Sequence, residues 1–189
     1  MKTTVYFIRH APSDTTQWHN QDRPLTATGF AGAQAVLETL KDVSFDRFIS
    51  SSSPRAIDTI KPLADLRQKK VETYDELQEL PLRGKEHHLE PHEVDREIKK
   101  VFESLDYKLP GGKSRREVEN IGVRCFHELM KKYEGEVIGL GTHGIIMTLI
   151  FASMDSTFGF EFWNSTSKPD IYKVEIDDEK IVSFERITM

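Results

Sequence analysis

Hydrophobic and polar positions along this chain follow two different periods, and the changes between them predict strands separated by helices. Short apolar runs rich in β-branched and aromatic residues predict strands. Apolar positions three and four residues apart predict helices with one buried face. In chain order, the predicted strands cover residues 4–8, 45–50, 71–74, 137–140, 171–176 and 181–187.

Helices are predicted between most of these strands. The first has Phe30, Ala33, Leu37 and Leu40 on its apolar face. Others are predicted after Ser53-Pro54, over about 92–104, after the capping box Ser114-Arg115-Arg116-Glu117, and over 145–154. The long helix after Ser114 has Val118, Ile121, Cys125 and Leu129 on one face. Strands alternating with helices predict an α/β fold: a three-layer sandwich whose central sheet is mostly parallel, with helices on both faces and an antiparallel C-terminal hairpin.

Residues 81–113 differ from the rest of the chain. They are rich in Pro, Gly and His around one charged helix, which predicts a short helical cap inserted over the edge of the sheet. The length of 189 residues suits one domain over 1–189 that includes this cap.

The composition and net charge of the chain limit which classes of ligand and which cellular setting we expect for the protein. The net charge of -5 argues against general nucleic-acid binding, which uses a basic face, but permits a small anion held by a few Arg side chains. Cys125 is the only cysteine, and its helical position predicts a packed side chain rather than a reactive thiol. The chain has no apolar run of roughly 18 residues and no apolar N-terminal segment, so we expect a cytoplasmic protein without a membrane span.

Titratable and cationic side chains stand at the ends of two predicted strands and at the start of one predicted helix. Arg9 and His10 end the first strand, and His143 follows the strand near residue 138. Arg55 falls in the first turn of a helix, where free backbone N–H groups favour anions. Because ligands bind beyond the carboxyl ends of parallel strands, these side chains and Glu79 are expected at one edge of the sheet.

Two Arg, two His and one carboxylate suit phosphoryl transfer through a covalent phosphohistidine. A neutral imidazole nitrogen attacks phosphorus, and Arg side chains stabilise the charge on the phosphoryl oxygens. The second His donates a hydrogen bond to the same oxygens, while Glu79 protonates the leaving oxygen and later activates water.

At this point the chain resembles the histidine phosphatase superfamily, which includes cofactor-dependent phosphoglycerate mutases. The matching motifs, in the order of the family, are Arg9-His10-Ala11, Arg23-Pro24-Leu25-Thr26 with Gly29, Ser52-Ser53-Pro54-Arg55-Ala56 with Thr59, Leu77-Gln78-Glu79, and Thr142-His143-Gly144. The resemblance implies that His10 is the phosphorylated nucleophile, that Arg9, Arg55 and His143 form the phosphate pocket, and that Glu79 is the proton donor. It also implies no metal and no bound cofactor.

The chain departs from the family pattern at several positions. Thr16 stands where mutase-like members have Asn, and Lys113 replaces an acid before the long helix. The run after Glu79 also differs, so Glu76 is kept as the alternative acid. We interpret these differences as altered substrate specificity, with Thr16, Arg23, Arg83 and Gly144 as the predicted substrate contacts.

Other motifs carry less weight. Gly139 to Gly144 match a dinucleotide-binding pattern, but only 45 residues follow Gly144, and no acidic strand end lies about 20 residues on. His87, His88 and His92 are expected in a solvated loop rather than at a metal. Phe158, Phe160, Phe162 and Trp163 are expected to pack in the core rather than line a substrate mouth.

The sequence therefore predicts a metal-independent phosphatase that acts on small phosphorylated substrates. The short cap favours hydrolysis over a mutase reaction, for which longer inserts shield the phosphoenzyme from water. The alternatives are a phosphoglycerate mutase-type phosphotransferase, a protein phosphatase acting on phosphohistidine or phosphoserine, and a phosphate sensor without turnover.

Overall fold

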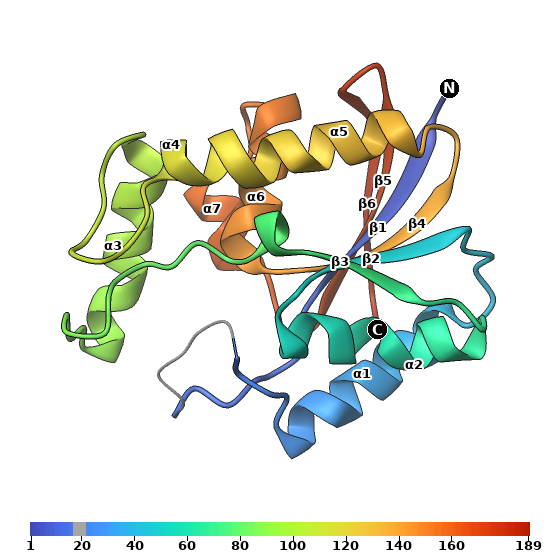
Figure 1. Ribbon diagram of the computed structural model, residues 1–189, viewed down its shortest axis with the longest axis horizontal. Helices are drawn as coiled ribbons and strands as arrows, with labels where there is room; N and C mark the ends of the chain where they lie inside the picture. The colour runs from blue at the N-terminus through green and yellow to red at the C-terminus, as the bar shows by residue number, and fades with distance from the viewer. Residues whose placement is uncertain (17–21) are drawn as a thin grey trace.

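A mixed sheet of six strands runs through the middle of the computed structural model, which describes residues 1–16 and 22–189 (Figure 1). The strands are β1 (Thr3–Arg9), β2 (Arg47–Ser51), β3 (Val71–Tyr74), β4 (Val137–Thr142), β5 (Asp170–Asp177) and β6 (Lys180–Ile187), in the spatial order β3-β2-β4-β1-β5-β6. The first four are parallel to one another, whereas β5 pairs antiparallel with β1 and β6 pairs antiparallel with β5. The predicted α/β architecture with an antiparallel C-terminal hairpin is confirmed.

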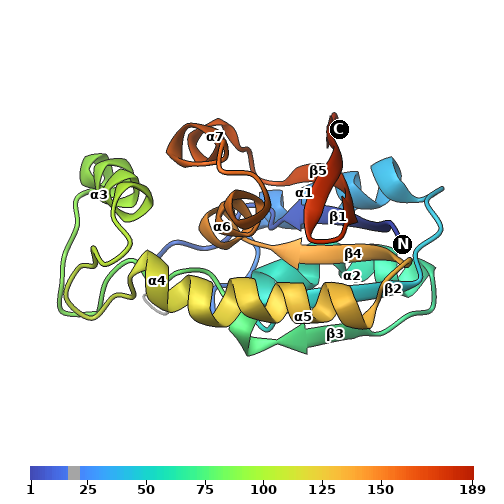
Figure 2. The ribbon, with the colours of Figure 1, turned by 90° about the horizontal axis from the view of Figure 1, so that it is seen from above.

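Helices cover both faces of this sheet (Figure 1, Figure 2). The helical segments are α1 (Ala27–Leu40), α2 (Pro54–Leu66), the 3₁₀ turn η1 (Asp75–Leu77), α3 (Pro91–Glu103), α4 (Arg115–Val118), the π turn η2 (Glu119–Val123), α5 (Arg124–Lys132), α6 (Gly144–Met154) and α7 (Phe160–Ser165). Along β1, Val5 and Phe7 join the core under α5 and α6, while Tyr6 and Ile8 join the core under α1 and α2. This alternation is the period of two that a strand buried on both faces requires.

The apolar face of α1 differs from the predicted one. Phe30 is 56% exposed, whereas Gly29, Ala33 and Val36 are buried. The start of α1 lies so close to the segment after β1 that a Cβ atom at Gly29 would be 2.0 Å from the carbonyl oxygen of Pro12. Gly29 therefore occupies the buried position, and Phe30, the next residue round the helix, points outward.

The long helix after Ser114 is interrupted, which the sequence did not predict. The capping box forms as expected, but the π turn η2 separates α4 from α5. A π turn adds a residue to the helical period and so rotates the side chains that follow. Ile121 is 46% exposed as a result, and the backbone at Gly122 approaches Glu76 so closely that a Cβ would lie 2.7 Å from its carbonyl oxygen.

Residues 81–113 form loops around α3, which lies beyond the end of the sheet (Figure 1). The description of residues 1–189 as one domain with this segment as an inserted cap stays a prediction. Within the described ranges, 1–16 and 22–189, no helix has both the length and the apolar character needed to cross a membrane.

The register of the strands decides which residues meet at the sheet edge. Arg9 pairs with Thr142 in the parallel β1–β4 ladder, and the N–H of His10 donates to the carbonyl oxygen of Thr142 at 2.9 Å. His10 and His143 therefore leave their strands side by side. Arg9 also pairs with Asp170 across the antiparallel β1–β5 ladder, so the residues before β5 reach the same edge.

Candidate active site

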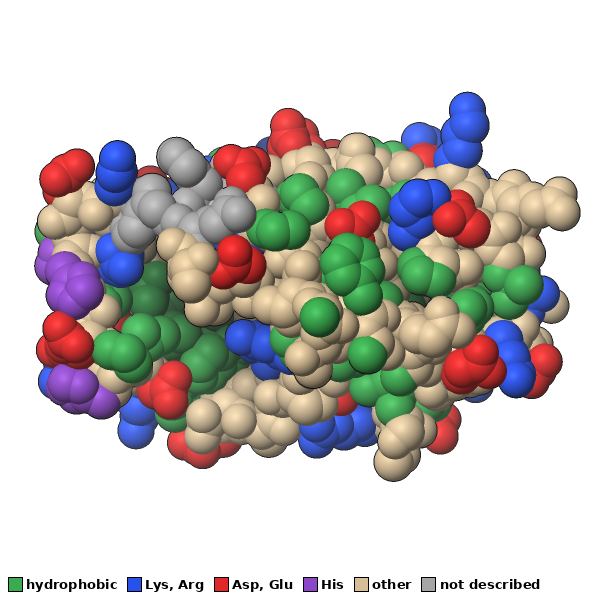
Figure 3. Space-filling model, turned by 90° about the horizontal axis from the view of Figure 1, so that it is seen from below, with side chains coloured by type: hydrophobic (Ala, Val, Ile, Leu, Met, Phe, Trp, Pro, Cys, Tyr) green, Lys and Arg blue, Asp and Glu red, His purple; other side chains and the backbone are tan. Residues whose placement is uncertain are grey.

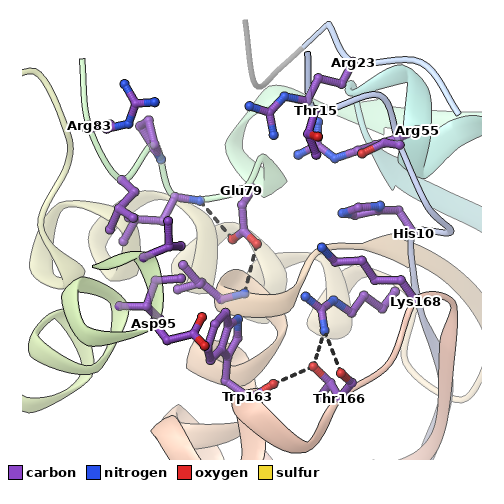
Figure 4. Close-up of a pocket in the computed structure, with 18 of the residues that line it drawn as sticks. His10, Thr15, Arg23, Arg55, Glu79, Arg83, Asp95, Trp163, Thr166 and Lys168 are labelled. Atoms are coloured by element: carbon purple, nitrogen blue, oxygen red, sulfur yellow. Dashed lines mark hydrogen bonds between the residues drawn. The ribbon is translucent and has the colours of Figure 1, made fainter. Parts of the chain in front are cut away.

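A pocket of about 770 Å³ lies at the edge where the parallel strands end (Figure 3, Figure 4). Its walls come from segments far apart in the sequence: the end of β1, the start of α2, the chain after η1, α3, and the segment between α7 and β5. Of the predicted site residues, Arg9, His10, Arg23, Arg55, Glu79 and Arg83 line this pocket. Figure 4 shows the His10 imidazole between the side chains of Arg55 and Lys168, with Glu79 across the pocket.

His10 is held in one tautomer by its own backbone neighbour. Its Nδ1 lies 2.7 Å from the carbonyl oxygen of Ala11, which only accepts hydrogen bonds, so Nδ1 carries the proton and Nε2 keeps its lone pair. The backbone here is fixed in turn by Thr59, whose hydroxyl oxygen accepts from the N–H of Ala11 at 2.9 Å. Burial and the charge of Arg55 lower the pKa of His10 well below its usual value, so the ring is neutral at pH 7.

His143 lies beside His10 and is fully buried. The two ring centroids are 5.3 Å apart, and Nε2 of His143 lies 2.7 Å from the hydroxyl oxygen of Ser51. Its Nδ1 is buried and has no hydrogen-bond partner within the described chain. Burial and the charge of Arg55 also lower the pKa of His143 well below the usual value. His143 is thus a neutral imidazole that lies beside His10 without itself lining the pocket.

Arg9 and Arg55 bring two buried guanidinium groups to the pocket. Nη1 of Arg9 donates to the hydroxyl and, at 3.2 Å, to the carbonyl oxygen of Thr166. Arg55 is the second residue of α2, as predicted, and burial lowers its pKa to about 10. Ser53 occupies the N-cap position, but its hydroxyl does not cap the helix. Both arginines remain charged at pH 7, which makes this end of the pocket suited to an anion.

Glu79, and not Glu76, faces the pocket. Its carboxylate accepts hydrogen bonds from the N–H groups of Ile145 at 3.0 Å and Ile146 at 3.1 Å, in the first turn of α6. Its negative charge opposes the effect of burial on the pKa values of Arg9 and Arg55. Glu76 is exposed and borders a separate, smaller recess.

The predicted substrate contacts occupy different places. Arg23 and Arg83 line the pocket, and burial together with the charge of Arg83 lowers the pKa of Arg23. Thr16 does not line it; its hydroxyl donates to Asp14 at 2.6 Å, while the neighbouring Thr15 lines the pocket.

Gly144 lies against the pocket rather than in its wall. A Cβ atom there would lie 2.8 Å from both Nη2 of Arg9 and the indole nitrogen of Trp163. The close approach of these two side chains therefore depends on glycine at this position.

The lining residues that were not predicted include Lys168, Trp163 and Asp95. The surrounding protein and the charge of Arg9 lower the pKa of Lys168. Its position follows from the antiparallel pairing of β5 with β1, a long-range contact that periodicity does not encode. The aromatic prediction holds for Phe158, Phe160 and Phe162, which pack against the core and are not among the lining residues. The ring centroids of Phe158 and Phe162 lie 5.3 and 5.6 Å from that of Phe151. Trp163 also packs against the core, but it lines the pocket as well, which the prediction had excluded.

The other candidate groups are placed as follows. His88 pairs with Glu90 at 2.9 Å on the surface, and among residues 1–16 and 22–189 no cluster of three His, Cys, Asp or Glu side chains fits a metal ion.

Cys125 is half-buried against the core, and burial raises the pKa of its thiol to about 11. The prediction of a packed cysteine is confirmed.

Fold and site together define an α/β protein whose pocket, at the parallel strand ends, is lined by two arginines and a neutral histidine, with a second buried histidine beside the first. The sequence model of the histidine phosphatase superfamily (branch 1) matches residues 5–185, and the chain belongs to that family. No curated protein matches it in sequence.

Solved structures with the same fold cover almost the whole chain. A mycobacterial glucosyl-3-phosphoglycerate phosphatase is 18% identical with a TM-score of 0.76, over 98% of this chain and 97% of its own. The alpha-ribazole phosphatase of Shigella flexneri is 21% identical with a TM-score of 0.75, over 98% and 96%. A structure named mycobacterial hydrolase 1 is 19% identical with a TM-score of 0.77, over 100% and 98%. At these identities the likeness establishes the fold.

Proposed function

We propose that this protein is a phosphatase that hydrolyses phosphomonoesters through a covalent phosphohistidine on His10, without a metal ion. The observation that carries the proposal is the fixed tautomer of His10, whose unprotonated Nε2 belongs to a neutral ring lining a pocket with Arg9 and Arg55. Family membership supports it, and two structural neighbours are named as phosphatases. The mycobacterial phosphatase has also been solved with inorganic phosphate bound.

In the first step, the lone pair on Nε2 of His10 attacks phosphorus while the bond from phosphorus to the ester oxygen breaks. Arg9 and Arg55 hold the phosphoryl oxygens and stabilise the charge that develops on them. The leaving alkoxide takes a proton from the carboxyl group of Glu79, so the alcohol departs neutral. Nδ1 of His143, buried and without a partner in the described chain, is the donor assigned to a phosphoryl oxygen.

In the second step, the carboxylate of Glu79 takes a proton from water, and the oxygen of that water attacks phosphorus. The phosphorus–nitrogen bond breaks, its electron pair returns to Nε2 of His10, and inorganic phosphate leaves. Glu79 ends protonated and His10 neutral, so both groups are ready for the next cycle. The positive charge that this scheme needs comes from protein side chains, including Lys168 beside His10 (Figure 4).

The test is phosphate release from a panel of phosphomonoesters in the presence of EDTA, comparing the wild type with His10→Ala. His127→Ala is the matched control, because His127 lies outside the pocket and bonds only to Ser153 among the described residues. We expect turnover in the wild type and control and none in His10→Ala. Turnover that survives in His10→Ala would overturn the proposal, and isomerised product with little free phosphate would indicate a mutase instead.

A further inference from the structure

The pocket extends well beyond the space that a phosphate group needs. Its volume of about 770 Å³ is in the range of sites that enclose a whole organic ligand, about 300–1,000 Å³. His10 and the two buried arginines occupy one end, at the strand termini. Six apolar side chains of the remainder form what we call the apolar floor: Leu80, Leu82, Leu89, Val94, Ile98 and Trp163. Polar side chains line the remainder as well, among them Arg83, Asp95 and Asn164.

The apolar floor is built by α3 and braced by α7. Val94 and Ile98 are four residues apart and so lie on the same face of α3. Ring contacts join the two helices behind this face, from Phe102 to Phe160 at 6.5 Å and from Phe160 to Trp163 at 5.6 Å. The floor is therefore backed by core packing. Figure 3 shows hydrophobic side chains inside this hollow of the surface.

Charged residues also lie around the floor. Lys85 and Asp95 are exposed, as expected for groups at the mouth. Arg83 donates through Nη1 to the backbone carbonyl oxygen of His87, which directs that nitrogen toward its own loop. A ligand that reaches from His10 toward α3 can therefore lie on hydrocarbon and an indole ring, with polar side chains beside them.

We propose that the substrates are phosphomonoesters whose alcohol carries an extended apolar body, alkyl or aryl, that lies on the apolar floor while the phosphate lies at His10. This inference rests on the proposed phosphatase function and adds the class of leaving group. Its physical basis is the removal of apolar surface on both ligand and floor from water, which a sugar or glycerol part would not achieve.

A homologous series of n-alkyl phosphates, from ethyl to hexyl, tests the inference with leaving groups of constant chemistry. If each added CH₂ is buried on the floor, kcat/KM rises roughly fourfold per CH₂. Glycerol phosphate serves as the polar comparison and should fall close to ethyl phosphate. If every ester is hydrolysed but kcat/KM does not change with chain length, the inference is overturned and the phosphatase function still stands.

Binding of n-alkylphosphonates, which are not hydrolysed, gives a readout that does not need catalysis. Affinity should rise with chain length by a similar factor per CH₂. If affinity rises but no ester is turned over, the proposed function fails and the apolar site stands. If affinity is independent of chain length, the inference fails.

The variant Leu89→Asn/Val94→Asn makes two half-buried positions of the floor polar. The ratio of kcat/KM for hexyl over ethyl phosphate is compared within each variant, so it does not depend on the fraction folded. We expect this ratio to fall at least tenfold. Leu105→Asn is the matched control, because Leu105 is 41% exposed and lies outside the pocket, and its ratio should equal that of the wild type. An unchanged ratio in the floor variant would contradict the proposal.

Discussion

The carboxylate of Glu79 accepts a hydrogen bond of 3.0 Å from the backbone N–H of Ile145, two residues after His143. This contact joins the chain after η1 to the first turn of α6. Because His143 precedes that turn, the contact fixes the proposed proton donor relative to the histidine pair. A second hydrogen bond, of 3.1 Å from the N–H of Ile146, holds the same carboxylate against the start of α6.

The first prediction separates Glu79 from Glu76. Glu79→Gln should lower kcat/KM for alkyl phosphates by about 100- to 10,000-fold, the usual worth of a positioned acid. The loss of kcat/KM should be much smaller for p-nitrophenyl phosphate, because its leaving group departs without a proton, whereas kcat should fall for both because water is no longer activated in the second step. Glu76→Gln, at an exposed site outside the pocket, should behave like the wild type. Equal losses of kcat/KM in Glu79→Gln for both classes of substrate would count against an acid role.

The pH dependence of the reaction follows from the neutral state of His10. Since burial and Arg55 lower its pKa, the nucleophile stays unprotonated as the pH falls through 6.5, and kcat/KM should decline only at lower pH. The charged side chains facing His10 are Arg9, Arg55 and Lys168, with Glu79 across the pocket. Removing one of these cations should raise the pKa of His10.

Lys168→Met should therefore move the acidic limb of the pH profile of kcat/KM to higher pH, whereas Lys168→Arg should leave this limb in place. The measurement is kcat/KM for one phosphomonoester between pH 4 and 8, roughly the span over which a histidine titrates. An acidic limb that stays where it is in Lys168→Met would show that this lysine does not act on His10.

Glycine at position 144 should be required for full activity. In Gly144→Ala, the new Cβ would lie 2.8 Å from Nη2 of Arg9, so the guanidinium must shift. A displacement near 1 Å at such a group costs on the order of 100-fold in kcat/KM. Gly159→Ala is the control, since no atom lies within 4 Å of a Cβ there. Unchanged kinetics in Gly144→Ala would mean that Arg9 does not need its observed position.

Stability should fall in mild acid because of the buried histidines. The pKa of His143 in the folded protein lies well below 6.5, so the unfolded chain binds the proton more tightly. The stabilisation is fully present above about pH 6.5 and is lost as the pH falls toward the folded pKa, at about 1.4 kcal/mol per pH unit for each such histidine. Urea unfolding of the wild type and His143→Gln at pH 7.5 and 5.5 measures this contribution, and His143→Gln should show the shallower dependence. If the free energy of unfolding changes equally between the two pH values in both proteins, His143 is not a neutral, buried group.

The parts of the fold that sequence periodicity predicted are those with local signals. Pro54 after Ser53, the capping box at Ser114 and the apolar runs of β1 and β4 each carry their information within a few residues. Topology then brought Arg9, His10, Arg55 and His143 to one edge, as expected for parallel strands. The errors at Phe30 and Ile121 arose where a close backbone approach or a π turn overrides the helical period.

The residues missed at the pocket depend on contacts that are distant in the sequence. Lys168 reaches the site because β5 runs antiparallel beside β1, and Trp163 because α7 packs against α3. No local motif marks either residue. The sequence therefore predicted the side chains at the strand ends better than it predicted the apolar floor.

The most direct test of the account is to locate the phosphate on the enzyme during turnover. Glu79→Gln, mixed with p-nitrophenyl phosphate, should form the phosphoenzyme quickly and hydrolyse it slowly, because water is then not activated. After an alkaline quench, peptide mass spectrometry should find an acid-labile phosphate on His10, formed with a stoichiometric burst of p-nitrophenol. Phosphate on another residue, or steady turnover without a burst or an adduct, would contradict the phosphohistidine mechanism.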